Sequence, residues 1–114
     1  MRLQRLPAVG AAICSLSVAL GAYASHAASA QDQHRFALAA LFAFAHGLAL
    51  IVMAARTSTL AGIGKLFLLG GIVLFSGSLA AAGFFSTSTR AVPIGGSLLI
   101  LGWLLAAADY WRKP

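Results

Sequence analysis

Charged residues divide the chain into long apolar segments. The 114-residue sequence has ten Asp, Glu, Lys and Arg side chains, and uncharged stretches of 26, 20, 24 and 18 residues cover positions 6–31, 36–55, 66–89 and 91–108. A transmembrane helix needs about 20 predominantly apolar residues to cross about 30 Å of hydrocarbon. Each stretch therefore predicts one membrane-spanning helix.

The predicted fold is all-α: a single domain over residues 1–114, an integral membrane bundle of four antiparallel helices. The expected helices cover about 7–27, 36–55, 64–85 and 92–110, and Pro7 and Pro93 stand at favourable starting positions. The connections are short, which favours packing between successive helices. A signal-peptide interpretation competes for the first segment, because Ala28-Ser29-Ala30 resembles a cleavage site. The apolar run is longer than a usual signal core, so we expect the Ala30–Gln31 bond to stay intact and the first helix to be retained.

The basic residues are distributed unevenly between the two predicted loop sides. One side has six, namely Arg2, Arg5, Arg56, Lys65, Arg112 and Lys113, and the other has two, Arg35 and Arg90. The positive-inside rule then predicts cytoplasmic N- and C-termini for a multi-pass membrane protein. The net charge of +6 is spread singly or in pairs between apolar spans of a chain that is 61% hydrophobic. This pattern argues against nucleic-acid binding, which needs a clustered basic face.

Small residues recur at four-residue spacing on the predicted helices. Small-xxx-small stripes allow close helix approach in lipid, and the residues expected to pack helices are Ser17, Gly21, Ser25, Ala39, Ala43, Gly47, Gly77, Gly95 and Gly96. The last helix ends in the expected interface anchors, Tyr110, Trp111, Arg112 and Lys113. We expect Asp109 to pair with Arg112 or Lys113, and Lys65 to extend toward the headgroups.

Ionisable groups inside a membrane are functional candidates by default, and they are few here. His46 is predicted at mid-depth, either as a neutral hydrogen-bonded residue or as a proton relay or metal ligand. His26 is predicted about 10 Å away in depth, which disfavours a shared metal or haem iron. Ser76 and Ser78 complete the candidate polar core, as packing residues or as the lining of a path. Cys14 is expected to behave as a small hydrophobe. No catalytic residue, metal or cofactor is predicted.

Several motifs occur in order along the chain. Gly21-Ala22-Tyr23-Ala24-Ser25-His26, His46-Gly47-Leu48-Ala49-Leu50, Phe75-Ser76-Gly77-Ser78-Leu79, Pro93-Ile94-Gly95-Gly96 and Gly102-Trp103 resemble the DUF423 family of small membrane proteins, which has bacterial and eukaryotic members. The resemblance implies four spans, a place in the bacterial inner membrane and no established activity. Family members often carry Tyr-Gln before the second histidine, where this chain has Phe42 and Ala43, so His46 lacks those side-chain partners.

Three functions are compatible with this pattern. The first is a non-enzymatic accessory or structural subunit that packs in the bilayer against itself or against a larger membrane complex. The alternative is a small oligomeric channel or transporter for a neutral or weakly polar solute, with His46 and the serines along its path. The third is a metal- or haem-binding protein that uses His26 and His46. The abundance of small residues and the scarcity of polar ones favour the first.

Overall fold

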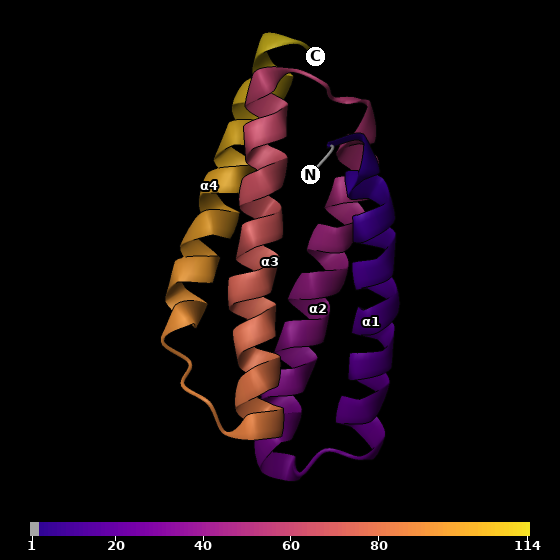
Figure 1. Cartoon of the computed structure of the whole chain (residues 1–114), viewed down its shortest axis with the longest axis vertical. Helices are drawn as coiled ribbons and strands as arrows, with labels where there is room; N and C mark the ends of the chain where they lie inside the picture. Colours follow the sequence, from indigo (N-terminus) through magenta and orange to yellow (C-terminus); the bar gives the residue numbers. More distant parts are fainter. Residues whose placement is uncertain (1–2) are drawn as a thin grey trace.

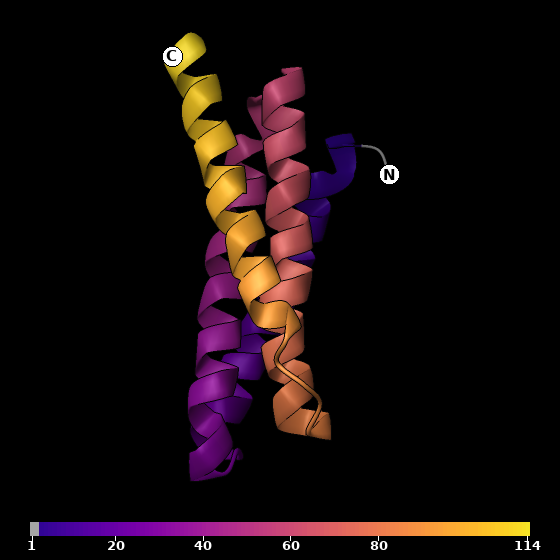
Figure 2. The same cartoon turned by 90° about the vertical axis from the view of Figure 1, so that its left-hand side faces the viewer.

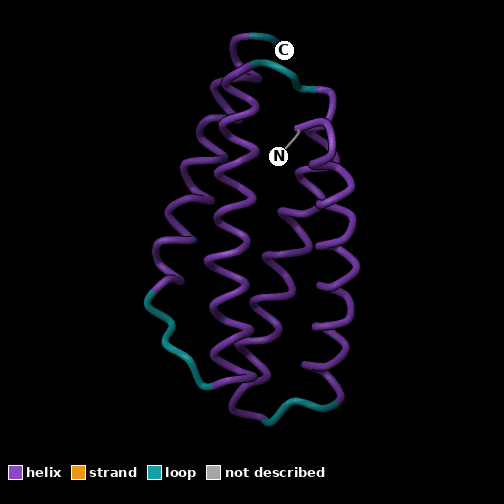
Figure 3. Tube along the Cα trace, in the orientation of Figure 1, coloured by secondary structure: helices purple, strands orange, loops and turns teal. Residues whose placement is uncertain are grey.

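Four long helices run up and down in sequence order in the computed structural model, which describes residues 3–114 (Figures 1 and 3). The elements are η1 (Leu3–Arg5), α1 (Leu6–His26), α2 (Ala30–Val52), η2 (Met53–Ala55), α3 (Thr59–Phe85) and α4 (Ala91–Arg112). The described residues contain no strand. The predicted all-α architecture of four antiparallel helices is confirmed.

All four helices are long and apolar enough to cross a membrane. The molecule measures 46 × 25 × 23 Å, so its long axis matches a bilayer of about 40–45 Å including headgroups. The beginning of α1, the α2–α3 connection and the end of α4 lie at the same end of the molecule (Figure 1). This end also carries most of the basic residues.

The capping residues start two helices earlier than predicted. The segment Gln31–Arg35, expected as a polar turn, forms the first turns of α2 because the Ser29 hydroxyl accepts a hydrogen bond from the Asp32 amide at 3.3 Å. Ser58 caps α3 in the same way, with the Ala61 amide at 3.1 Å. The predicted boundaries were based on the apolar segments alone. The polar caps extend both helices by a turn or more beyond those segments.

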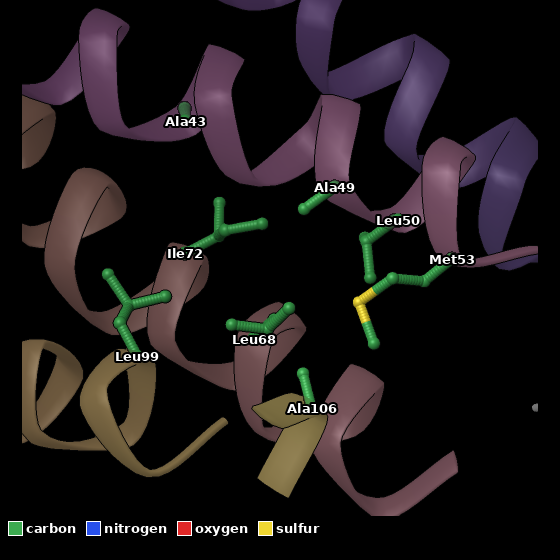
Figure 4. Close-up of a cluster of buried hydrophobic side chains, with 8 residues drawn as sticks. All are labelled: Ala43, Ala49, Leu50, Met53, Leu68, Ile72, Leu99 and Ala106. Atoms are coloured by element: carbon green, nitrogen blue, oxygen red, sulfur yellow. The ribbon is translucent and has the colours of Figure 1, made fainter. Parts of the chain in front are cut away.

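Successive helices pack against each other: α1 on α2, α2 on α3, and α3 on α4. Figure 2 shows α4 inclined across α3. The buried hydrophobic cluster lies among α2, α3 and α4, together with Met53 of η2 (Figure 4). Its members are Ala43, Ala49, Leu50, Met53, Leu68, Ile72, Leu99 and Ala106. The cluster joins the α1–α2 hairpin to the α3–α4 hairpin.

Glycines spaced by seven residues bring α3 and α4 together. A Cβ on Gly64 would lie 3.3 Å from the Gly102 carbonyl oxygen, and one on Gly71 would lie 3.0 Å from the Gly95 carbonyl oxygen. The buried positions of α4, namely Gly95, Leu99, Gly102, Ala106 and Asp109, alternate steps of four and three residues. This is the heptad pattern of left-handed helix packing, here with glycines at the closest contacts.

A similar seven-residue spacing governs α1. Gly10, Ser17 and Ala24 are buried, and a Cβ on Gly47 of α2 would lie 2.8 Å from the Gly10 carbonyl oxygen. The predicted stripe of Ser17, Gly21 and Ser25 is only partly used: Gly21 has an ordinary contact with Ala40, and Ser25 is exposed. Four-residue steps rotate a stripe by about 40° each, whereas seven-residue steps drift by about 20°.

The predicted packing residues on α2, α3 and α4 also divide into buried and open positions. Ala39, Ala43 and Gly95 are buried. Gly96 is half-buried, and a Cβ there would lie 3.7 Å from the Phe75 ring. Gly77 was expected at a helix contact within the chain, but it is exposed, and a Cβ there would meet nothing within 4 Å. Gly77 therefore leaves open space on the outer surface of α3.

An aromatic cluster closes the other end of the bundle. Tyr23 of α1, Phe36 of α2 and Phe84 of α3 have ring centroids 4.6–5.3 Å apart. Phe36 is buried, and Gly83 leaves the space that its ring occupies. Such ring pairs contribute about 0.5–1.5 kcal/mol each beyond area burial in water. Together they connect three helices near the connections opposite the basic end.

Adjacent glycines of α4 provide a matched test of close packing. Gly95→Ala places a methyl group 2.9 Å from the Phe75 Cα, where backbone cannot move aside, and should lower the free energy of unfolding by about 1–3 kcal/mol. Gly96→Ala makes only an ordinary contact and should be neutral or stabilising by up to about 1 kcal/mol. Thermal unfolding in detergent measures both. Equal effects of the two substitutions would contradict the role assigned to Gly95.

Candidate functional site

His46 occupies a closed hydrogen-bonding position between α2 and α4. The side chain is 7% exposed; the Trp103 Nε1–H donates to His46 Nε2 at 2.9 Å, and His46 Nδ1 lies 2.6 Å from the Phe42 carbonyl oxygen. An indole N–H is only a donor, so Nε2 must be the acceptor and Nδ1 must carry the proton. This pattern is the neutral imidazole with both nitrogens in use.

The lack of a side-chain hydroxyl at Phe42 does not leave His46 without a partner. The backbone carbonyl of Phe42 accepts the hydrogen bond, and its ring stacks on the imidazole with an interplanar angle of 12° and a centroid distance of 5.8 Å. Sequence reasoning missed Trp103 as the second partner. The indole N–H of Trp103 was the available signal in the sequence, because such a donor in an apolar setting needs an acceptor.

The other candidate polar residues do not gather around His46. Ser76 donates to the Ala39 carbonyl oxygen at 2.8 Å, two turns away from His46 on α2. His26 is exposed at the end of α1, and Ser78 is half-buried on α3. Within residues 3–114, no group of three or more His, Cys, Asp or Glu side chains is placed to hold a metal ion.

Three serine hydroxyls within the helices donate to backbone carbonyls. Ser17 donates to Ile13 at 2.7 Å and Ser97 to Pro93 at 2.9 Å, both within their own helices. Ser76 makes its bond across the α2–α3 interface. A hydroxyl proton that is already donated is not available to a solute, so these three hydroxyls contribute hydrogen bonds to the fold.

A second polar cluster, at the basic end, joins the α2–α3 connection to the end of α4. Asp109 is 5% exposed; one carboxylate oxygen accepts from the Ser58 hydroxyl, and the other lies 3.0 Å from Arg56 Nε as an ion pair. Arg56 also donates from Nη2 to the Lys113 carbonyl oxygen at 2.7 Å, and its Cζ lies 3.9 Å from the Tyr110 ring centroid. The expected pairing of Asp109 with Arg112 or Lys113 is therefore wrong.

The position of Asp109 within the heptad pattern explains this correction. It follows Gly102 by seven residues, so it lies on the face of α4 that packs against α3, whereas Arg112 is exposed. Arg112 and Lys113 project from other parts of the helix end, together with the exposed Trp111. The four predicted anchor residues are thus placed at the end of the bundle, with Tyr110 also engaged by Arg56.

Lys65 is buried rather than extended toward solvent. It is 4% exposed, and its Nζ donates to the Arg56 carbonyl oxygen at 2.6 Å and to the Met53 carbonyl oxygen at 3.2 Å. Met53 begins η2 and Arg56 follows its last residue, so both carbonyls lie where the helical hydrogen bonding of α2 and η2 ends. Lys65 reaches them from the second turn of α3, and its positive charge is favourable there because the C-terminal end of a helix attracts a cation.

These features define a class: a small α-helical protein with four helices of membrane-spanning length whose interior polar groups are paired within the chain. A family model described as "Protein of unknown function (DUF423)" matches residues 20–96, about two-thirds of the sequence. The chain belongs to the DUF423 family. No solved structure matches it.

The His46–Trp103 contact can be measured with a double-mutant cycle. His46→Leu, Trp103→Phe and the double variant should each be less stable than the parent protein, with a coupling of about 0.6–1.7 kcal/mol between the two sites. The coupling arises because either single change removes the same hydrogen bond. Thermal unfolding in detergent gives the three values, and strictly additive effects would contradict a direct bond.

The Arg56–Asp109 pair is tested by removing one charge without changing shape. Asp109→Asn keeps a partner for Ser58 but leaves the mostly buried Arg56 without its counter-ion, so the free energy of unfolding should fall by about 1–3 kcal/mol. Asp32→Asn is the control, since Asp32 and Arg35 are one turn apart and form a pair at 3.5 Å that is more exposed than Arg56–Asp109. Its effect should stay below about 0.5 kcal/mol. If Asp32→Asn lowered the free energy of unfolding as much as Asp109→Asn, the greater contribution assigned to the Arg56–Asp109 pair would be refuted.

Proposed function

We propose that this chain is a non-enzymatic accessory or structural subunit of the bacterial inner membrane that packs against a transmembrane helix of another protein. The observation that carries the proposal is a groove of about 320 Å³ between α1 and α3, open along the side of the bundle. Its lining residues are Ile13, Leu16, Ser17, Leu20, Ala39, Ala43, Ile72, Val73, Ser76, Gly77 and Ala80.

The groove has the composition of an unfilled helix-packing site. Its residues from α2 are both alanines, and Gly77 contributes a backbone surface with open space above it. Small residues allow a neighbouring backbone to come close, and this contact is what drives helix association where lipid provides no hydrophobic effect. A transmembrane helix presenting small or aliphatic side chains is the occupant that this surface favours.

The polar groups of the groove support a packing role over a solute path. Ser17 and Ser76 donate their hydroxyl protons to backbone carbonyls, and His46 has both nitrogens engaged elsewhere. A channel or transporter for polar solutes needs hydrogen-bonding groups that face the path. His46 and Ser76 therefore support packing more than they support the alternative function, a channel or transporter.

The distribution of charge supports the proposed orientation. Among the described residues, Arg5, Arg56, Lys65, Arg112 and Lys113 lie at one end, whereas Arg35 and Arg90 lie at the other. The positive-inside rule places the richer end in the cytoplasm. Both chain ends and the α2–α3 connection are thus proposed to face the cytoplasm.

Photo-crosslinking in native membranes tests the packing role. A photoreactive amino acid at Val73, a 60% exposed wall of the groove, should form an adduct with one defined transmembrane protein. The same probe at Val18 is the matched control, because Val18 is 63% exposed on α1 and does not line the groove. We expect at least a several-fold higher yield of that adduct from Val73.

A space-filling variant makes the result specific to the groove. Gly77→Leu should abolish the Val73 adduct without lowering the thermal stability of the isolated protein, because no atom of another helix lies within 4 Å of the added Cβ. Ala11→Leu adds comparable bulk at an exposed position that does not line the groove, and should leave the adduct unchanged. Equal yields at Val73 and Val18, or adducts with lipid alone, would refute the proposal.

A further inference from the structure

The basic end of the bundle contains a hollow that the packing role does not use. It has a volume of about 400 Å³ and lies between the α2–α3 connection and the end of α4. Its lining residues are Ala55, Arg56, Thr57, Ser58, Asp109 and Lys113. Five of the six carry hydrogen-bonding or charged side chains, in contrast to the apolar groove between α1 and α3.

The single carboxylate in this hollow is already neutralised. Both oxygens of Asp109 have partners, the Ser58 hydroxyl and Arg56 Nε. Within residues 3–114, Lys113 has no acidic partner, and Lys65 and Arg112 add further positive charge at the same end. The hollow therefore has an excess of positive charge available to an anion.

Arg56 is held in place before any ligand arrives. The contact with Asp109, the hydrogen bond to the Lys113 carbonyl and the Tyr110 ring restrain its guanidinium, whose side chain is 20% exposed. The contacts involve Nε and Nη2, so the N–H groups of Nη1 remain for an oxyanion. A restrained guanidinium is well suited to a phosphate because little side-chain freedom is lost on binding.

The depth of the hollow indicates the source of the phosphate. Tyr110 and Trp111 follow directly after Asp109, and Trp111 is 88% exposed, as expected for residues at the headgroup level. The proposed orientation puts this end in the cytoplasm, and basic pockets between membrane helices on the cytoplasmic side are suited to anionic headgroups. We propose that this hollow, formed by Arg56, Thr57 and Lys113, binds the phosphate of an anionic phospholipid such as phosphatidylglycerol.

Native mass spectrometry of the full-length protein in detergent tests the site. Dioleoyl-phosphatidylglycerol should give retained adducts, whereas dioleoyl-phosphatidylcholine, which has a phosphate but no net charge, should give several-fold fewer. Lys113→Gln should weaken phosphatidylglycerol binding about five-fold, the effect of one basic residue near an anionic headgroup. Arg112→Gln is the matched control: it removes the same charge from an adjacent exposed residue that does not line the hollow, and should have less than half the effect.

Each other outcome overturns the proposal. Equal losses for Lys113→Gln and Arg112→Gln would mean diffuse surface attraction without a site, and equal retention of the two lipids would remove the charge selectivity. Thermal stabilisation by 10 mM inorganic phosphate in lipid-free detergent, matching that by phosphatidylglycerol, would assign the hollow to free phosphate instead. Melting of both variants at the parental temperature without lipid verifies folding. The result is independent of the Val73 crosslink, because lipid binding needs no protein partner.

Discussion

Close approach of backbones at glycine is the interaction on which this structure depends. Lipid removes the hydrophobic drive that holds soluble helices together, so cohesion must come from van der Waals contact over short distances. The pairs Gly64–Gly102 and Gly71–Gly95 provide it between α3 and α4, and Gly10–Gly47 provides it between α1 and α2. The larger side chains of the buried hydrophobic cluster, which include Leu50 and Leu68, then join the two hairpins.

The same apolar setting dictates how polar groups behave. A buried donor or acceptor without a partner costs several kcal/mol in hydrocarbon, so His46, Ser76 and Lys65 each bond to a group within the chain. These bonds occupy the hydrogen-bonding groups of the three residues within the chain. What remains open is on the surface: an apolar groove over α2 and a basic hollow at one end. Both proposed interactions follow from this division.

Particular residues show how far prediction from the sequence could go. The helix number followed from the spacing of charges. The helix starts were misplaced because Ser29 and Ser58 extend helices into polar sequence. The prediction that Ser25 packs against a neighbouring helix was wrong, because a stripe with four-residue spacing rotates away from that helix. Gly10 was not predicted as a packing residue, because the buried small residues of α1 are spaced by seven positions, at 10, 17 and 24.

The sequence by itself determined the number of helices, their membrane-spanning length, their order and the uneven distribution of charge, since each depends only on local composition and on hydrocarbon thickness. Only the tertiary structure decided that Trp103 fixes the tautomer of His46, that Arg56 pairs with Asp109, and that Lys65 turns inward. These contacts depend on the rotation and relative depth of packed helices. Periodicity constrains both quantities, but the pairing of individual glycines sets them.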